Sequence, residues 1–214
     1  MSPASAPSRA PAVPRPAATL VLVRPAASGF ELLLLQRADK GDHFSNAWVF
    51  PGGIVDAGDA RGHALCTGLD DAAASARLGL ARGGLDFYLA AIRECFEEAG
   101  VLLADDARGR PAATGEALAA LREPLRRGEC DFASVCAGHG LTVSPARLAY
   151  IAHWVTPVGL PKRFDTRFFV SAVPGEQVAH HEHVPVGAAL HGRRARDGER
   201  AGVALVAVVG DQVQ

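Results

Sequence analysis

The stretch that decides the fold of this 214-residue chain reads Arg93-Glu94-Cys95-Phe96-Glu97-Glu98-Ala99-Gly100-Val101. Its three glutamates stand at positions i, i+3 and i+4, so their carboxylates share one face of an α-helix. We predict this helix over residues 85–100. Asp86 can cap its start, and Gly100 can end it in the left-handed conformation.

The three carboxylates indicate a cation. At this spacing Glu94, Glu97 and Glu98 repel one another, which is costly in a helix unless a cation compensates the charge. Hard divalent cations prefer oxygen ligands, and Mg²⁺ that also contacts substrate phosphates is the usual occupant. Arg93 lies four residues before Glu97, where an ion pair can hold that glutamate's rotamer. The alternative is an acidic helix face that water solvates.

A glycine turn, Pro51-Gly52-Gly53, lies upstream of the helix and ends a short strand at residues 47–50. Glycine lets the backbone turn sharply and approach a ligand closely. The turn, together with Arg93 and Gly100, favours the metal site over the solvated face.

Further strands and helices are predicted on both sides of this helix. Strands are expected at residues 18–24, 30–37, 148–156, 164–173 and 203–209, and helices near residues 70–78, 116–127 and 131–136. Residues 31–35 are nearly continuously apolar, as in a strand buried on both faces. Because the strands do not strictly alternate with the helices, we expect an α/β fold of the α+β kind, with a mixed sheet flanked by helices.

The composition excludes several classes of protein. Apolar residues make up 49% of the chain and the net charge is -1, so no basic field indicates nucleic acid or a membrane surface. Cysteines 66, 95, 130 and 136 form no Cys-x-x-Cys pair, so we expect free thiols in a reducing compartment. The apolar runs are far shorter than the roughly 18 residues that a membrane span needs.

The nine residues quoted above resemble the second half of the Nudix box, Arg-Glu-U-x-Glu-Glu-x-Gly-U, in which U is bulky and aliphatic. The first half of the box resembles Pro51-Gly52-Gly53-Ile54-Val55-Asp56-Ala57-Gly58-Asp59, with Asp59 where the family has Glu. Between Asp59 and Arg93 lie 33 residues instead of seven, which is an insertion of 26 residues at about 60–85. Whether Asp59 reaches the acidic helix is left open.

An interrupted box resembles the branch of Nudix enzymes that acts on coenzyme A and acyl-coenzyme A. Three further segments resemble that branch, namely Leu33-Leu34-Leu35-Gln36-Arg37, Ala47-Trp48-Val49-Phe50-Pro51-Gly52-Gly53, and His153-Trp154-Val155-Thr156-Pro157 with Arg163-Phe164-Asp165-Thr166-Arg167-Phe168-Phe169. The resemblance implies a Nudix-type α/β/α sandwich. We expect a disordered extension at residues 1–17 and one Nudix domain over 18–214, poorly defined after about 175.

The same resemblance implies hydrolysis of a nucleoside diphosphate derivative with Mg²⁺ or Mn²⁺ as cofactor. It implies that Glu97, Glu98 and the Gly53 carbonyl bind the metal, that Glu94 is a ligand or the base, and that Arg93 orients a glutamate. Coenzyme A species are the expected substrates. An ADP-ribose or nucleotide-sugar diphosphatase and a non-catalytic nucleotide-binding module are the alternatives.

Candidate substrate contacts lie near the start of a later strand. Lys162, Arg163 and Arg167 are candidate phosphate contacts, because guanidinium groups grip phosphate oxygens bidentately. Surface charges at a strand start are the equally favoured alternative. Strand alternation would place Arg163 and Arg167 on one face and send Phe164 and Phe168 into the core.

Two acidic residues, Asp59 and Glu182, are candidate accessory acids. The expected partner is a small-molecule nucleotide, with no nucleic acid and no membrane, and a homodimer is left open. The chain carries no Ser-Lys-Leu ending, so a cytoplasmic location is expected.

Overall fold

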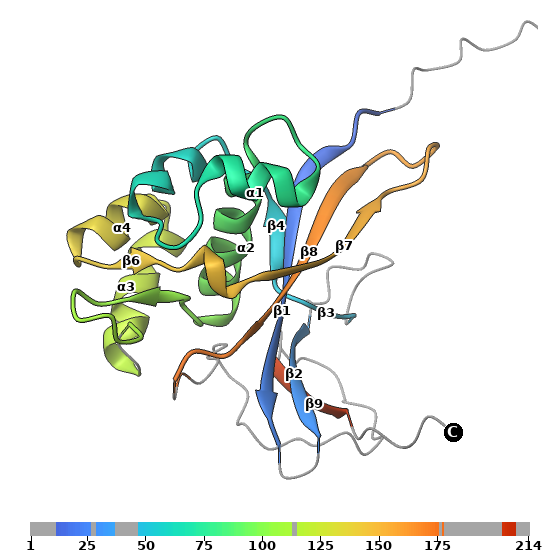
Figure 1. Ribbon diagram of the computed structural model, residues 1–214. Helices are drawn as coiled ribbons and strands as arrows, with labels where there is room; N and C mark the ends of the chain where they lie inside the picture. The colour runs from blue at the N-terminus through green and yellow to red at the C-terminus, as the bar shows by residue number, and fades with distance from the viewer. Residues whose placement is uncertain are drawn as a thin grey trace, which may run out of the picture.

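The computed structural model describes residues 12–26, 29–36, 47–112, 115–175, 177 and 203–208. In this part of the chain a mixed seven-stranded sheet lies beside a group of helices (Figure 1). The expected α/β fold with a mixed sheet is therefore confirmed. None of the described helices is long and apolar enough to cross a membrane.

The sheet is built around its first strand. Its strands are β1 (Arg15–Pro25), β2 (Phe30–Gln36), β3 (Trp48–Val49), β4 (Gly52–Ile54), β7 (Ala149–Val155), β8 (Phe164–Ala172) and β9 (Val203–Val208). Strand β1 pairs in parallel with β8 and antiparallel with both β2 and β4. This pairing places the glycine turn of β4 beside the middle of the sheet.

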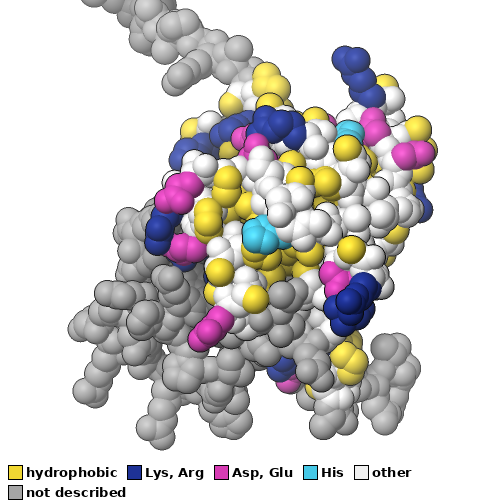
Figure 2. Space-filling model, turned by 90° about the vertical axis from the view of Figure 1, so that its left-hand side faces the viewer, with side chains coloured by type: hydrophobic (Ala, Val, Ile, Leu, Met, Phe, Trp, Pro, Cys, Tyr) yellow, Lys and Arg dark blue, Asp and Glu magenta, His cyan; other side chains and the backbone are white. Residues whose placement is uncertain are grey.

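The helices gather on one side of this sheet (Figure 1). They are η1 (Asp59–Leu65, 3-10), α1 (Asp71–Leu78), α2 (Gly84–Ala99), α3 (Glu116–Arg126), α4 (Phe132–Gly138) and η2 (Pro145–Arg147, 3-10). A small second sheet joins β5 (Ala104–Asp105) to β6 (Thr142–Val143). Helix α2 packs on β1 and β4, while α1, α3 and η1 pack on α2. Seen from this helical side, acidic and basic side chains lie close to one another around an apolar area (Figure 2).

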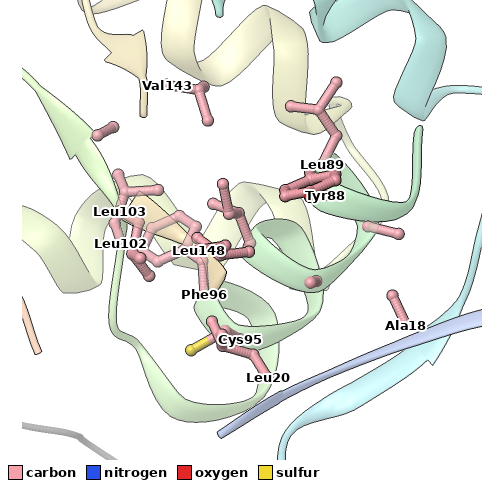
Figure 3. Packing of buried hydrophobic residues seen from close by; sticks show 14 of the residues in the cluster. Ala18, Leu20, Tyr88, Leu89, Cys95, Phe96, Leu102, Leu103, Val143 and Leu148 are labelled. Atoms are coloured by element: carbon pink, nitrogen blue, oxygen red, sulfur yellow. The ribbon is translucent and has the colours of Figure 1, made fainter. Parts of the chain in front are cut away.

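Helix α2 is the centre of the hydrophobic core (Figure 3). Its fully buried side chains include Tyr88, Leu89, Ile92, Cys95 and Phe96. They belong to one cluster with Ala18 and Leu20 of β1 and with Leu102, Leu103, Val143 and Leu148. Each large apolar side chain buried in this way contributes roughly 1.5–3 kcal/mol to stability. The core therefore fixes α2 firmly against the sheet.

The start of β1 corrects the expected N-terminal boundary. The strand begins at Arg15, so the expectation of a disordered extension as far as residue 17 is wrong at its end. Ala17 is buried, the Arg15 amide donates to the Arg163 carbonyl, and the Pro16 carbonyl accepts from Val55. Proline lacks an amide hydrogen but can still accept in this way, so the prolines did not prevent a strand here.

The start of α2 also differs from the expectation. Asp86 does not cap it, because the Asp71 carboxylate of α1 accepts hydrogen bonds from Gly83 N at 3.0 Å and Leu85 N at 2.9 Å. These bonds, that from Leu85 above all, lower the pKa of Asp71. Asp86 pairs instead with His63 at 2.7 Å. The insertion thus carries the cap of the helix that follows it.

Strand β2 is less buried than its sequence indicated. Leu33 and Leu35 are buried, whereas Leu32 and Leu34 are half-buried. The strand therefore turns one face to the core and is only partly covered on the other.

The four cysteines are free thiols, as expected.

Candidate active site

The glycine turn brings β4 against the acidic face of α2. The Gly52 amide donates to Glu98 Oε2 at 3.0 Å. A Cβ at Gly53 would lie 2.3 Å from Glu94 Oε1, so a side chain there would displace that carboxylate from its present position. Gly53, Glu94 and Glu98, which the sequence predicted to share a site, therefore lie together.

Arg93 links the two halves of the interrupted box. Its Nε donates to Asp59 Oδ1 at 2.7 Å, and its Nη2 donates to Asp59 Oδ2 at 3.2 Å and to the Ile54 carbonyl at 2.9 Å. Its Nη1 donates to Glu94 at 2.9 Å and to Glu97 at 3.5 Å. Burial alone would lower the pKa of Arg93, but Asp59, Glu94 and Glu97 together raise it above its ordinary value.

Asp59 does reach the helix, and it does so through Arg93. Its side chain is only 1% exposed. Its oxygens accept from Arg93 and, at 2.8 Å, from the Asp56 amide. The 26-residue insertion follows directly, and η1 and α1 both pack on α2, so the long segment still brings its two ends together.

Glu97 has an unfavourable environment for a negative charge. Burial is the main reason that its pKa lies above the ordinary value of a glutamate. The charge of Arg93 lowers this pKa, whereas the charges of Glu94 and Asp59 raise it. Its side chain is still 27% exposed, so a ligand can reach it. A bound cation would offset the repulsion.

The carboxylates of this site fit a hard divalent cation, since such cations prefer oxygen ligands. Within the described part of the chain, no three Asp, Glu, His or Cys side chains already enclose a common metal position. The Glu94 carboxylate is turned towards Arg93 and that of Glu98 towards Gly52. The chemistry of the residues therefore fits a metal, and the two side chains would have to rotate to bind it.

Arg122 of α3 was not anticipated from the sequence. It is 9% exposed and donates to the Glu97 carbonyl at 2.6 and 2.9 Å and to the Glu98 carbonyl at 2.8 Å. Carbonyls in the last turn of a helix lack intrahelical partners, and a cation there complements the helix dipole. Arg122 thus fixes the turn that carries both glutamates. Arg122 shares the buried face of α3 with Leu118 and Leu125, and this helical spacing is the sequence feature that could have predicted its burial.

Two of the predicted substrate contacts, Lys162 and Arg163, lie beside the start of β8. Arg163 donates from Nε to the Thr156 carbonyl at 3.0 Å and from Nη1 to the Ala12 carbonyl at 2.7 Å. Lys162 is exposed beside the start of β8. A phosphate-binding role for Lys162 and Arg163 stays a prediction. Glu182, the candidate accessory acid, lies outside the described residues.

Arg167 corrects the expected facing of β8. It is 5% exposed, pairs with Asp165, and lies over the Phe87 ring with its guanidinium carbon 5.5 Å from the ring centre. Phe169 is fully buried on the same face, whereas Phe164 is exposed. The prediction that Phe164 and Phe168 enter the core is therefore wrong, because α2 covers the face of β8 that carries the odd-numbered residues.

Residues 74–189 match the family described as the NUDT19 Nudix domain. The acyl-coenzyme A diphosphatase NUDT19 of Homo sapiens is 32% identical over 185 residues, which cover 68% of this chain and 48% of the human protein. The protein of the same name from Xenopus laevis is 31% identical over 67% of this chain and 47% of its own length. The chain thus spans about half the length of the curated relatives it matches.

A solved structure is similar in fold. The crystal structure of a NUDIX hydrolase from Alicyclobacillus acidocaldarius has a TM-score of 0.62 and 29% identity, covering 79% of this chain and 75% of that one. The family match covers more than half of the chain and includes the whole of α2. The protein therefore belongs to the Nudix hydrolases, in the family of the NUDT19 Nudix domain.

Proposed function

We propose that this protein hydrolyses the diphosphate linkage of coenzyme A or acyl-coenzyme A, with Mg²⁺ or Mn²⁺ as cofactor. The observation that carries the proposal is the crowding of acidic side chains around Arg93, at the point where the Gly52-Gly53 backbone meets α2. The substrate class is supported by relatives that are named acyl-coenzyme A diphosphatases.

In this proposal Glu97, Glu98 and the Gly53 carbonyl bind the metal, and Glu94 is a further ligand or the base. A divalent metal lowers the pKa of bound water and stabilises the leaving phosphate. Arg93 holds the rotamers of Glu94 and Glu97, since it donates to both. A diphosphate would be repelled by the acidic cluster alone, so the cation is required for binding as well as for reaction.

The positive charge of Arg93 offsets the negative charge of the acidic cluster on α2 only in part. Asp59 neutralises much of the Arg93 charge, which leaves less of it for Glu94 and Glu97. Arg122 binds backbone carbonyls of α2 at the same turn. The chain thus brings the glutamates together on one side of α2 while leaving negative charge for a ligand to compensate.

Identification of products by mass tests this proposal. The protein is incubated with Mg²⁺ or Mn²⁺ and with coenzyme A, ADP-ribose or NADH. We expect coenzyme A to give adenosine 3′,5′-bisphosphate and 4′-phosphopantetheine. Cleavage of ADP-ribose or NADH alone would support the nucleotide-sugar alternative, and binding of nucleotides without any cleavage would support the non-catalytic module.

A further inference from the structure

A cavity of about 190 Å³ lies beside Glu97. Its walls come from the start of the insertion, from α2 and from the connection between α3 and α4. The volume is that of about six water molecules in the liquid, which is enough for a ring or a short branched chain. The cavity is therefore large enough for part of a substrate whose diphosphate lies at Glu97.

The insertion builds one wall of this cavity. Its 3-10 helix η1 packs against both α2 and α4. Arg61 of η1 forms an ion pair at 3.1 Å with Asp131, the residue that caps α4. Both residues line the cavity, so the pair joins the inserted wall to the α4 wall. An uninterrupted box would contain no segment of this kind.

Negatively charged side chains outnumber positively charged ones in the lining. Four carboxylates contribute, against two guanidinium groups, and they belong to Asp56, Asp59, Glu97 and Asp131. The Ser134 amide is the main cause that lowers the pKa of Asp131, so this side chain stays a charged acceptor. Phe132 adds an apolar surface. Such a lining repels a second phosphate group and suits an uncharged group that carries N–H or O–H donors.

We propose that this cavity is the subsite for the uncharged, donor-bearing group next to the scissile diphosphate. The inference rests on the proposed function, because that function places the diphosphate at Glu97. In coenzyme A both the adenine amine and the pantetheine hydroxyl and amides have this chemistry. The insertion then acts as a specificity element, since Arg61 and its neighbours form the wall that the group contacts.

Ala133→Leu tests the subsite by reducing its volume. Ala133 lies on α4 and lines the cavity, whereas the exposed Ala137 lies one turn further along the same helix and does not. Ala137→Leu is therefore the matched control. We expect Ala133→Leu to raise KM for coenzyme A about tenfold with kcat unchanged, a size typical of altered contacts in a substrate pocket. Ala137→Leu should behave as the wild type.

Two truncated substrates identify the group that occupies the cavity. The P²-methyl ester of ADP keeps the adenosine, and the methyl ester of pantetheine 4′-diphosphate keeps the pantetheine. In Ala133→Leu, KM should rise for the ester that carries the recognised group and stay unchanged for the other. An unchanged KM for both esters would contradict the inference.

Cys130 provides a measurement that does not depend on turnover. It lines the cavity and is partly exposed, whereas Cys66 lies outside the lining and burial raises its pKa to about 11. Alkylation of each thiol by iodoacetamide is followed by mass, with and without an excess of acetyl-coenzyme A, which has no free thiol. We expect slower alkylation of Cys130 and no change at Cys66.

The outcomes separate the subsite from the proposed function. If the wild type cleaves coenzyme A but KM is unchanged in a folded Ala133→Leu variant, the subsite is refuted and the diphosphatase stands. Unprotected Cys130 in saturating acetyl-coenzyme A refutes the subsite in the same way, even if the variant does not fold. A wild type that cleaves no diphosphate with either metal refutes the proposed function itself.

Discussion

Two regions of this molecule combine a mostly buried arginine with carboxylates, and they differ in the number of carboxylates around it. Around α2, Arg93 contacts Asp59, Glu94 and Glu97, so negative charge exceeds positive charge. On β8, Arg167 forms its ion pair with Asp165. Uncompensated charge in a partly buried site is unfavourable unless a ligand binds there. The excess at α2 therefore favours the proposed metal site, whereas on β8 a single carboxylate faces Arg167.

The two arginines also differ in the groups that lie around them. Beside α2, the Gly52-Gly53 turn leaves the Glu94 and Glu98 carboxylates close to main-chain atoms, where a small cation could lie. On β8, the Arg167 guanidinium lies over the Phe87 ring and is covered by the core. Residue types that look equally functional in a sequence thus have different surroundings in the structure.

Glu97→Gln should have the largest effect on activity. It removes a charge that the proposal assigns to metal binding, so we expect kcat to fall on the order of 10³-fold. The matched change on β8, Asp165→Asn, should leave kcat within about twofold but lower the melting temperature, because Arg167 loses its charged partner. Steady-state kinetics and thermal unfolding of both variants check this contrast. Equal losses of activity would remove the distinction between the two regions.

Asp59→Ala should have the largest effect on stability. Asp59 is almost fully buried and accepts two hydrogen bonds from Arg93 and one from the Asp56 amide, so its removal leaves these donors without their acceptor inside the structure. We expect the free energy of unfolding to fall by about 3 kcal/mol. Urea unfolding measures this loss, with Asp59→Glu as the conservative control. A loss as small as that of an exposed ion pair would mean that Arg93 relies on other partners.

Arg122→Ala should weaken metal binding by about 10- to 100-fold, the usual effect of removing a group that orients metal ligands. Arg122→Lys should recover only part of the affinity, because an ammonium group cannot reproduce the paired contacts to the Glu97 and Glu98 carbonyls. Titration calorimetry with Mn²⁺ measures the affinity. Arg127→Ala on the exposed side of the same segment is the control. If Arg122→Ala lowered the stability of the protein but left its affinity for Mn²⁺ unchanged, the role of Arg122 would be structural only.

Asp71→Ala should have a smaller effect, which depends on pH. Asp71 accepts two amide hydrogen bonds at the start of α2, so its loss should cost about 1 kcal/mol of stability at pH 7. Its folded-state pKa is lowered, so it stabilises the protein above its unfolded pKa of about 3.9 and loses this effect as the pH falls through the folded value. Unfolding at pH 7 and at pH 3 should therefore show a difference that shrinks in acid. A difference that is the same at both values would refute the cap.

The order of elements could be predicted because it depends on local signals. The helix α2, its glycine end at Gly100 and the strands β7 and β8 follow from periodicity and capping residues. The carboxylate spacing on α2 likewise placed Glu94 and Glu98 on the face that meets the glycine turn. These features depend on neighbours within one or two helical turns.

Contacts between distant segments could not be predicted in the same way. Asp71 replaces Asp86 as the cap of α2, and Arg122 reaches the carbonyls of Glu97 and Glu98 from another helix. The facing of Arg167 depends on which side of β8 the helix covers. Each of these depends on tertiary packing, and alternation along one strand gives no information about which face is inside.

A metal titration followed by thermal unfolding tests the central claim most directly. If the excess carboxylate at α2 is a divalent-metal site, the melting temperature of the wild type should rise with Mg²⁺ or Mn²⁺ concentration, since a ligand that binds only the folded state stabilises it by mass action. The rise should be lost in Glu97→Gln and kept in Asp165→Asn. No rise in the wild type, or an equal rise in Glu97→Gln, would contradict the assignment of this acidic cluster as the metal centre.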